Sequence, residues 1–189
     1  MEYFDIRNED GSLTGKIKAR SRVHEDGDIH GTSHVWIVRR NNGGECELLL
    51  QKRSAGKDAY PGCYDISSAG HLPAGQDFLP SALRELYEEL GIRAEKEDLI
   101  FLGIHKGYYE EVFYGKPFRN YEVSHVYIYE KPIREEELVL QKEEVESVKW
   151  MSLSECYQVT REKNPLYILA EEELDMIKKY MESNKVTLQ

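Results

Sequence analysis

Three glutamates lie close together near the end of a predicted helix, in the segment Arg84–Gly91. At about 100° per residue, Glu85 and Glu89 share one helix face and Glu88 lies on the adjoining flank. Like charges at this spacing repel one another, and the helix dipole disfavours anions near a helix C-terminus. A divalent cation removes both penalties, because hard cations such as Mg²⁺ bind carboxylate oxygens. The cluster therefore predicts a metal site; the alternative, for so short a pattern taken alone, is a solvated acidic face.

The helix that positions these glutamates is predicted over Asp77–Leu90. Its apolar side chains recur with a helical period on one face, which consists of Leu79, Ala82, Leu83, Leu86 and Leu90. Asp77 can cap the start of the helix, and Pro80 is tolerated in the first turn, where amide groups lack helical partners. Gly91 is placed to end the helix in a left-handed conformation. One face of the helix thus packs on a core while another presents the carboxylates.

The rest of the chain alternates between predicted strands and helices, which indicates an α/β layered domain. The first two strands fall within about residues 1–20, and the full set is Tyr3–Ile6, Thr14–Lys18, His34–Arg39, Glu45–Lys52, Leu99–Ile104, Glu122–Tyr129 and Ser147–Met151. Asp10-Gly11 predicts a turn, Asn41–Gly44 predicts a hairpin, and residues 54–65 have the composition of a loop. A terminal helix is predicted over Asn164–Glu182, with an apolar face of Leu166, Leu169, Leu174, Ile177 and Met181.

Composition restricts the class of protein and its partners. The 189 residues are 40% apolar and 32% charged, which predicts one folded domain over residues 1–189. The net charge of -10 argues against nucleic acid as a partner, because phosphate backbones are bound by clustered Lys and Arg. No apolar run approaches the roughly 20 residues that span a bilayer, so no membrane partner is expected. A small anionic substrate stays compatible with the charge, because a bound cation reverses the local field.

The cysteines are three in number and far apart in the sequence, at Cys46, Cys63 and Cys156. Without a C-x-x-C pair they indicate neither a zinc knuckle nor a disulfide framework. The N-terminus is polar and lacks the apolar segment of a secretory signal. We therefore expect a reducing, cytoplasmic location. The sequence does not determine the oligomeric state, and a homodimer is compatible with it.

The stretch Gly70–Ile92 resembles the Nudix box: Gly, five residues, Glu, seven residues, then Arg-Glu-apolar-x-Glu-Glu-x-Gly-apolar. Every named position matches except the first glutamate, which is Gln76 in this sequence. A box of this length and spacing is highly specific, so the chain is identified as a member of the Nudix superfamily. In that family the first glutamate steadies the box, largely through the motif arginine, here Arg84. Gln76 can hydrogen-bond Arg84 only without charge assistance, and Asp77 is a partial substitute.

The resemblance implies the Nudix fold, a mixed β-sheet sandwiched between α-helices, of the α/β (α+β) class. It implies hydrolysis of a diphosphate linkage in a nucleoside diphosphate derivative or similar small molecule, by a water activated by Mg²⁺ or Mn²⁺. The implied metal ligands are Glu85, Glu88, Glu89 and Gly70. The implied catalytic residues are Arg84, Glu85, Glu88 and a downstream glutamate, Glu122. One carboxylate serves as general base, and the family does not fix which one.

The chain also resembles one branch of the superfamily, isopentenyl-diphosphate isomerase and its hydrolase-like relatives, from about Val23 to Trp150. The matching elements are His24, His30, Leu50–Ser54, Lys57, Pro61-Gly62, Gly70-His71 and Asn120–Val123. Carried over by position, Arg53 and Lys57 would contact the diphosphate, for which a planar fork donor and a mobile ammonium are suited. The alternative is that both are solvated cations that follow a strand.

In the isomerases, histidines at positions resembling His24, His30 and His71 help to bind a metal, together with a glutamate like Glu122. Imidazole and carboxylate sets suit transition metals. The acidic residue expected two positions before Glu122 is Asn120 here, and loop histidines are more often ordinary surface residues than ligands. Glu122 is the better supported member, because many Nudix hydrolases use an extra downstream glutamate.

The isomerase reaction needs a cysteine just before the Gly-His pair, and that position is Ala69. Cys63 lies six residues earlier and is no obvious replacement. A hydrolase is therefore favoured, with two alternatives: an isomerase, or a catalytically weak nucleotide-binding regulatory domain, which the Gln76 substitution keeps open. Specificity is expected in a loop at Tyr108–Arg119, whose several aromatic side chains could stack on a base or pack as a lid.

Overall fold

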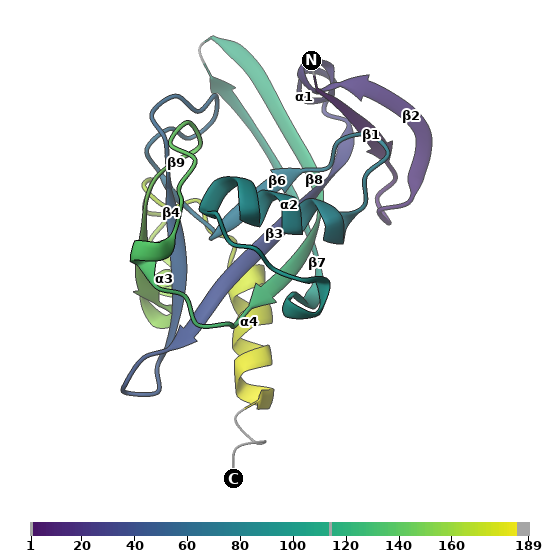
Figure 1. The fold of residues 1–189 in the computed structure, drawn as a ribbon. Coiled ribbons are helices and arrows are strands. Elements are labelled where there is room, and N and C mark those ends of the chain that lie inside the picture. Colours follow the sequence, from purple (N-terminus) through teal and green to yellow (C-terminus); the bar gives the residue numbers. More distant parts are fainter. Residues whose placement is uncertain (1, 114, 185–189) are drawn as a thin grey trace.

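The computed structural model describes residues 2–113 and 115–184. Its centre is a seven-stranded sheet of order β5-β4-β3-β8-β7, with β6 paired to β3 and β9 paired to β4 (Figure 1). The strands are β3 (Ile29–Arg40), β4 (Cys46–Arg53), β5 (Tyr64–Asp65), β6 (Ser68–His71), β7 (Ile100–Phe113), β8 (Lys116–Tyr129) and β9 (Val145–Ser152). β3 and β8 run parallel and the other pairs run antiparallel, so the sheet is mixed.

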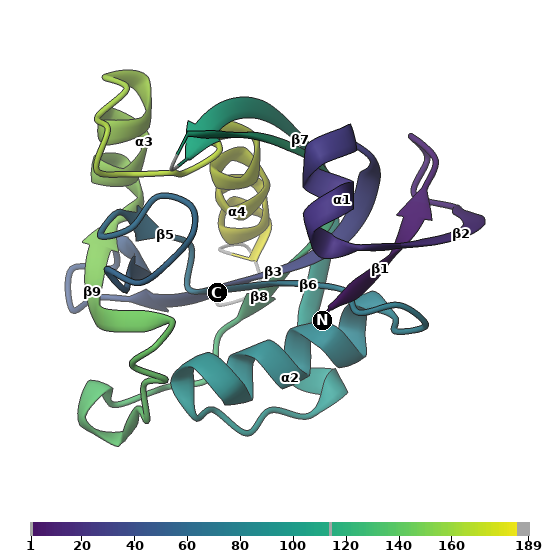
Figure 2. The same cartoon turned by 90° about the horizontal axis from the view of Figure 1, so that it is seen from above.

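Helices cover both faces of this sheet, as the view from above shows (Figure 2). α2 (Phe78–Leu90) packs on one face, against a core that includes Val35, Ile37 and Leu49. α3 (Leu153–Arg161) and α4 (Glu171–Ser183) lie on the other, against side chains such as Trp36 and Leu48. Short 3₁₀ turns at Lys96–Asp98 and Glu135–Glu137 connect elements. The predicted architecture, a mixed sheet between helices, is confirmed.

The predicted helix end signals of α2 are confirmed. The Asp77 side chain accepts a hydrogen bond from the Phe78 N–H at 2.8 Å, and Gly91 ends the helix with φ of 73°. Ala82, Leu86 and Leu90 are fully buried on the sheet. A regular amphipathic period and two local end signals therefore fix the position of the helix that carries the carboxylates.

The N-terminal strands form a separate two-stranded sheet, β1 (Tyr3–Arg7) with β2 (Leu13–Ala19), around the predicted turn. A short helix that the sequence did not predict, α1 (Arg20–Asp26), follows them. This unit is fastened to the segment before α2, because the Tyr3 carbonyl accepts from Ala74 N–H and the Asp5 carboxylate accepts from Gly75 N–H. Phe4 of β1 is completely buried. The N-terminal residues therefore form part of the framework around the site.

The prediction of a loop at Tyr108–Arg119 is wrong, because β7 and β8 extend through this segment as a long hairpin. Tyr108 pairs with Tyr121 and Val112 with Pro117, and side chains along β7 alternate between the exposed and half-buried faces. Aromatic and β-branched residues favour extended backbone, and that preference outweighs the loop composition. Residue 114 lies outside the described residues.

The terminal helix begins later than predicted, at Glu171 rather than Asn164. The intervening segment is tied to the edge of the sheet: Tyr64 N–H donates to the Leu166 carbonyl at 2.7 Å, and Ile168 N–H donates to the Tyr64 carbonyl at 2.9 Å. Leu166 is consequently exposed, while Leu174, Ile177 and Met181 are buried as expected. Helix α3 was also not predicted.

Among the described residues no helix is both long and apolar enough to cross a bilayer, and the three cysteines are free thiols.

Candidate metal and diphosphate site

The carboxylates of α2 are packed against β6. Glu89 is only 4% exposed, and one of its oxygens accepts a hydrogen bond from the Ala69 N–H at 3.2 Å. Glu85 lies directly over Gly70, where an added Cβ would be 2.1 Å from the Glu85 Cδ. Gly70 is therefore required for close approach of the helix carboxylate to the strand. Glu88 lies farther out, with a side chain 47% exposed.

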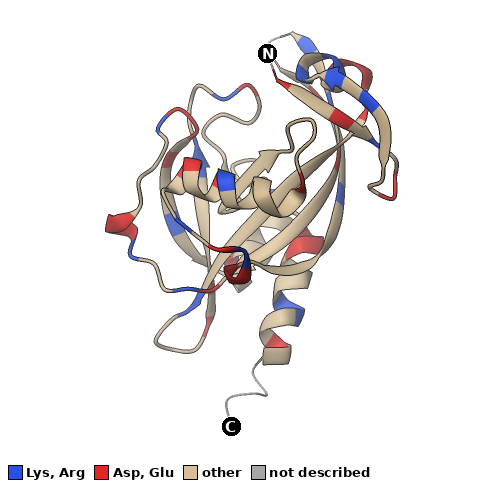
Figure 3. Ribbon diagram, turned by 45° about the vertical axis from the view of Figure 1, so that its right-hand side comes forward, with Lys and Arg blue, Asp and Glu red and all other residues tan. Residues whose placement is uncertain are grey.

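Arg84 orders the outer part of the carboxylate cluster. Its guanidinium donates to Glu85 at 2.7 Å and to Glu88 at 2.7 Å, and acidic and basic bands adjoin on α2 (Figure 3). Gln76, whose amide is able to hydrogen-bond Arg84 in principle, is exposed, and its own backbone N–H donates to the Pro73 carbonyl. Arg84 is thus held by the two metal-site candidates themselves.

Burial makes this cluster electrostatically unusual. Burial raises the pKa of Glu85 to about 7, although Arg84 opposes the shift, and it raises the pKa of Glu89 to about 8, with a further contribution from Glu85. Both carboxylates therefore resist ionisation in the folded protein. The alternative interpretation of this helix, a solvated acidic face, does not apply to either of them. Oxygen ligands arranged in this way fit a hard divalent cation such as Mg²⁺ or Mn²⁺, which would compensate their charge.

These carboxylates line a cleft of about 670 Å³. The predicted diphosphate contacts lie on its wall, but both already have partners. Arg53 donates to Asp65 at 2.9 Å and twice to the Ala59 carbonyl, at 3.1 and 3.0 Å. Lys57 forms an ion pair with Glu144. Arg53 therefore stabilises the loop that precedes β5, whereas the positive charge of Lys57 acts on Glu89 and opposes the rise in its pKa.

The three histidines predicted as a weaker metal site come together beside Glu122. The ligand nitrogens of His24, His30 and His71 all lie within 4.8 Å of one another. Among the described residues, the Nε2 atom of each is buried and has no hydrogen-bond partner. Phe4 stacks on two of the rings, at centroid distances of 5.4 Å from His30 and 4.8 Å from His71. We refer to these three residues as the histidine nest.

The chemistry of the nest fits a cation. Burial lowers the pKa of His24 to about 4 and also lowers the pKa values of His30 and His71, so all three rings are neutral near pH 7. Glu122 pairs with His30 in the β3–β8 register, and its Oε1 lies 3.9 Å from His30 Nε2 and 3.7 Å from His71 Nε2. Neutral imidazoles with free lone pairs beside a carboxylate suit a transition metal. Asn120, also buried, stands where a second carboxylate was expected.

Comparison with known proteins agrees with the geometry of the box. Residues 31–171 match the model of the NUDIX domain. The chain belongs to the Nudix family. It is 42% identical over 171 residues to "Nudix hydrolase 3" of Arabidopsis thaliana. The aligned segment covers 88% of this chain but only 21% of that protein. It is 42% identical over 144 residues to an uncharacterized Nudix hydrolase of Clostridium acetobutylicum, covering 76% and 66%.

A solved structure with the same fold is that of a Deinococcus radiodurans protein, with a TM-score of 0.66 and 14% identity over 94% of this chain and 98% of that one. The second resemblance also has a counterpart: an isopentenyl-diphosphate Delta-isomerase of Rhizobium rhizogenes is 31% identical over 99 residues, covering 52% of this chain and 46% of the isomerase. These matches establish the Nudix family for this chain.

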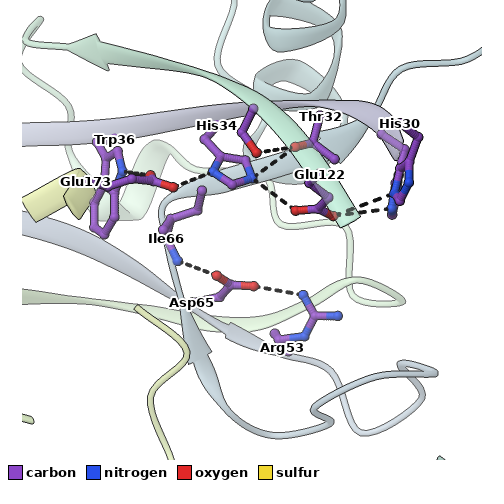
Figure 4. Close-up of polar contacts among 11 residues, drawn as sticks. His30, Thr32, His34, Trp36, Arg53, Asp65, Ile66, Glu122 and Glu173 are labelled. Atoms are coloured by element: carbon purple, nitrogen blue, oxygen red, sulfur yellow. Dashed lines mark hydrogen bonds and ion pairs between the residues drawn. The ribbon is translucent and has the colours of Figure 1, made fainter. Parts of the chain in front are cut away.

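Two cleft residues that the sequence did not single out are His34 and Glu173 (Figure 4). Burial alone would lower the pKa of His34, but the adjacent Glu173 carboxylate raises it to about 9. Glu173 is 2% exposed and, despite its burial, His34 keeps its pKa below the usual value. A local signal for His34 existed, since it follows His30 and Thr32 at alternate positions of β3 and therefore shares one face of the strand with them. No local feature of the sequence distinguishes Glu173 from the acidic residues next to it.

Proposed function

We propose that this Nudix protein hydrolyses the diphosphate linkage of a small molecule, a nucleoside diphosphate derivative or a similar compound, with Mg²⁺ or Mn²⁺ as cofactor. The proposed ligands are Glu85, Glu88, Glu89 and the backbone of Gly70. The observation that supports this most is the burial of Glu85 and Glu89 close together on a cleft wall, where both resist ionisation. Carboxylates with strongly raised pKa values in a cleft are typical of functional sites, and a divalent cation would compensate the charge of both.

The cation, when bound, neutralises the diphosphate and lowers the pKa of an attacking water. The chain's own residues have separate tasks. Arg84 holds the carboxylates of Glu85 and Glu88 in place. Lys57 on the cleft wall is placed to exchange its partner Glu144 for a diphosphate oxygen, and Arg53 keeps the neighbouring loop in shape. Glu122, with a side chain 17% exposed in the same cleft, is a candidate for the general base alongside Glu85 and Glu88.

The deciding experiment is a phosphate-release assay over a panel of nucleoside and other small-molecule diphosphates, with Mg²⁺ and Mn²⁺ varied. We expect hydrolysis of at least one compound that requires the metal. The control variant is Glu172→Gln, which should hydrolyse the same compounds as the wild type, because Glu172 is an exposed glutamate on α4, outside the cleft lining. Nucleotide binding without hydrolysis under all conditions would support the regulatory-domain alternative instead.

A second candidate, isopentenyl-diphosphate isomerase, is favoured by one observation, the histidine nest with Glu122 beside it. We nevertheless propose that isomerisation is absent, because the position of the family's thiol is Ala69. Cys63 is no substitute, since its thiol donates to the Pro165 carbonyl and burial raises its pKa. A cytoplasmic location, a homodimer and the absence of nucleic-acid and membrane partners stay predictions from composition.

A further inference from the structure

A buried carboxylate from the C-terminal helix reaches the face of the sheet that carries His34 and Trp36. Glu173, in the first turn of α4, accepts hydrogen bonds from His34 Nδ1 at 2.8 Å and from Trp36 Nε1 at 2.6 Å (Figure 4). Both donors are on β3, two residues apart, so they project from the same face of the sheet. Because a carboxylate only accepts hydrogen bonds, these contacts fix the rotation of the His34 ring.

The other edge of the ring faces the candidate site. His34 Nε2 lies 3.3 Å from Thr32 Oγ1 and 4.0 Å from Glu122 Oε2, the latter an ion-pair distance rather than a hydrogen bond. The second oxygen of Glu122 faces His30 and His71, at 3.9 and 3.7 Å. The Glu122 carboxylate therefore stands between the His34 edge on one side and the histidine nest on the other, as Figure 4 shows for His30.

The buried ion pair between His34 and Glu173 contributes little to the stability of the fold. Removing two charges from water costs about as much as their attraction returns, and apolar residues of similar volume stabilise at least as well. The sheet face around Trp36 is otherwise an apolar core, so a purely structural contact there would be served by apolar side chains. The surroundings also hold the Thr32 hydroxyl, which pairs with Ser124 at 2.6 Å. The arrangement is therefore better explained by what it does to Glu122.

We propose that His34 is a positioning residue, held by Glu173 of the C-terminal helix, which orients Glu122 so that its Oε1 faces the histidine nest and the cleft. The inference rests on the proposed hydrolase function, in which Glu122 acts. It makes α4 part of the active site, although the helix is distant from the Nudix box in sequence. Residues that orient a functional carboxylate are typically worth about 10- to 100-fold in activity when removed.

The test is a mutant cycle that compares His34→Asn/Glu173→Gln with Glu122→Gln and with the triple variant. The double variant removes both charges together and so leaves no unpaired buried charge to unfold the protein. We expect it to lower kcat about tenfold or more while KM changes less than about threefold. In the Glu122→Gln background it should have no further effect, because residues that act through one another are not additive. Glu172→Gln should match the wild type.

An equal loss of kcat in both backgrounds, or no loss in either, would overturn the proposal. A second readout needs neither substrate nor metal: NMR of ¹⁵N-labelled histidine side chains. The double variant should shift the His30 and His71 signals in the wild-type background and not in Glu122→Gln. If the wild type hydrolyses no diphosphate, the proposed function fails, and these signals alone decide the positioning role. Unshifted His30 and His71 signals would then overturn it.

Discussion

The carboxylate of Glu85 occupies the space beside Gly70 that any side chain would need, since a Cβ at Gly70 would lie 2.1 Å from the Glu85 Cδ. Gly70→Ala must therefore displace Glu85 from the carboxylate cluster. We expect hydrolysis to fall by a factor on the order of a hundred, because a misplacement of about 1 Å in a catalytic site has a cost of that size. Steady-state kinetics at saturating Mn²⁺ measures the effect.

Gly75→Ala is an instructive comparison, because Gly75 has open space at its Cβ position but a φ of 79°. That substitution strains the backbone and should lower stability without altering the carboxylate cluster. If Gly70→Ala retains wild-type turnover and metal affinity, the packing of Glu85 on Gly70 has no part in the site.

Glu89→Gln separates function from stability on the same helix. The substitution keeps size and helix propensity nearly unchanged and removes one negative charge. If Glu89 is a metal ligand, hydrolysis should fall about a hundredfold or more, equivalent to roughly 2.7 kcal/mol of transition-state stabilisation. Without metal, the melting temperature at pH 8 should hold or rise, because the buried site no longer has to ionise next to Glu85.

Leu86→Ala is the opposite case, since Leu86 is fully buried against the sheet on the other side of α2. It should cost about 2–5 kcal/mol of stability and leave the metal requirement unchanged. A Glu89→Gln protein with wild-type turnover at saturating Mg²⁺ would refute the central assignment of the site.

The parts of the site that the sequence predicted are those that a local pattern encodes. Helix α2, its Asp77 cap and its Gly91 end follow from residues within one or two turns. The distant parts depend on tertiary contacts with no local signature. Residues 164–170 pair with the sheet edge at Tyr64 instead of joining α4, and Glu173 meets His34 across 139 positions of sequence. The resemblance to the isomerase branch grouped His24, His30, His71 and Glu122, and the β3–β8 register, in which His30 pairs with Glu122, shows how the fold brings two of them together.

Isomerase activity should be absent, because Ala69 provides no acid beside the Gly-His pair. Its N–H instead donates to Glu89, so the strand at this point serves the carboxylate helix. Incubation of isopentenyl diphosphate with the protein and Mg²⁺ or Mn²⁺ should yield no allylic product above background. Ala69→Cys should add no more than a trace. Turnover by the wild type within about tenfold of a typical enzyme rate, roughly 10 per second, would contradict the prediction.

Stability should depend on pH and metal together. Burial raises the pKa of Glu85 to about 7 and of Glu89 to about 8, whereas both titrate near 4.5 when unfolded. Between those limits these two carboxylates bind more protons in the folded protein than in the unfolded chain, so their contribution to metal-free stability should fall by several kcal/mol as pH rises from about 5 to 8. Mn²⁺ binds the deprotonated carboxylates, and its stabilisation should grow over the same range. His34, with its pKa raised to about 9, adds a decline of the same sign, whereas the lowered pKa values of His24, His30 and His71 add a rise below about pH 6.5. The difference between wild type and Glu89→Gln removes both effects and isolates the contribution of Glu89. A thermal-melting series in which the Mn²⁺ shift is independent of pH, and equal in both proteins, would exclude Glu89 as a ligand.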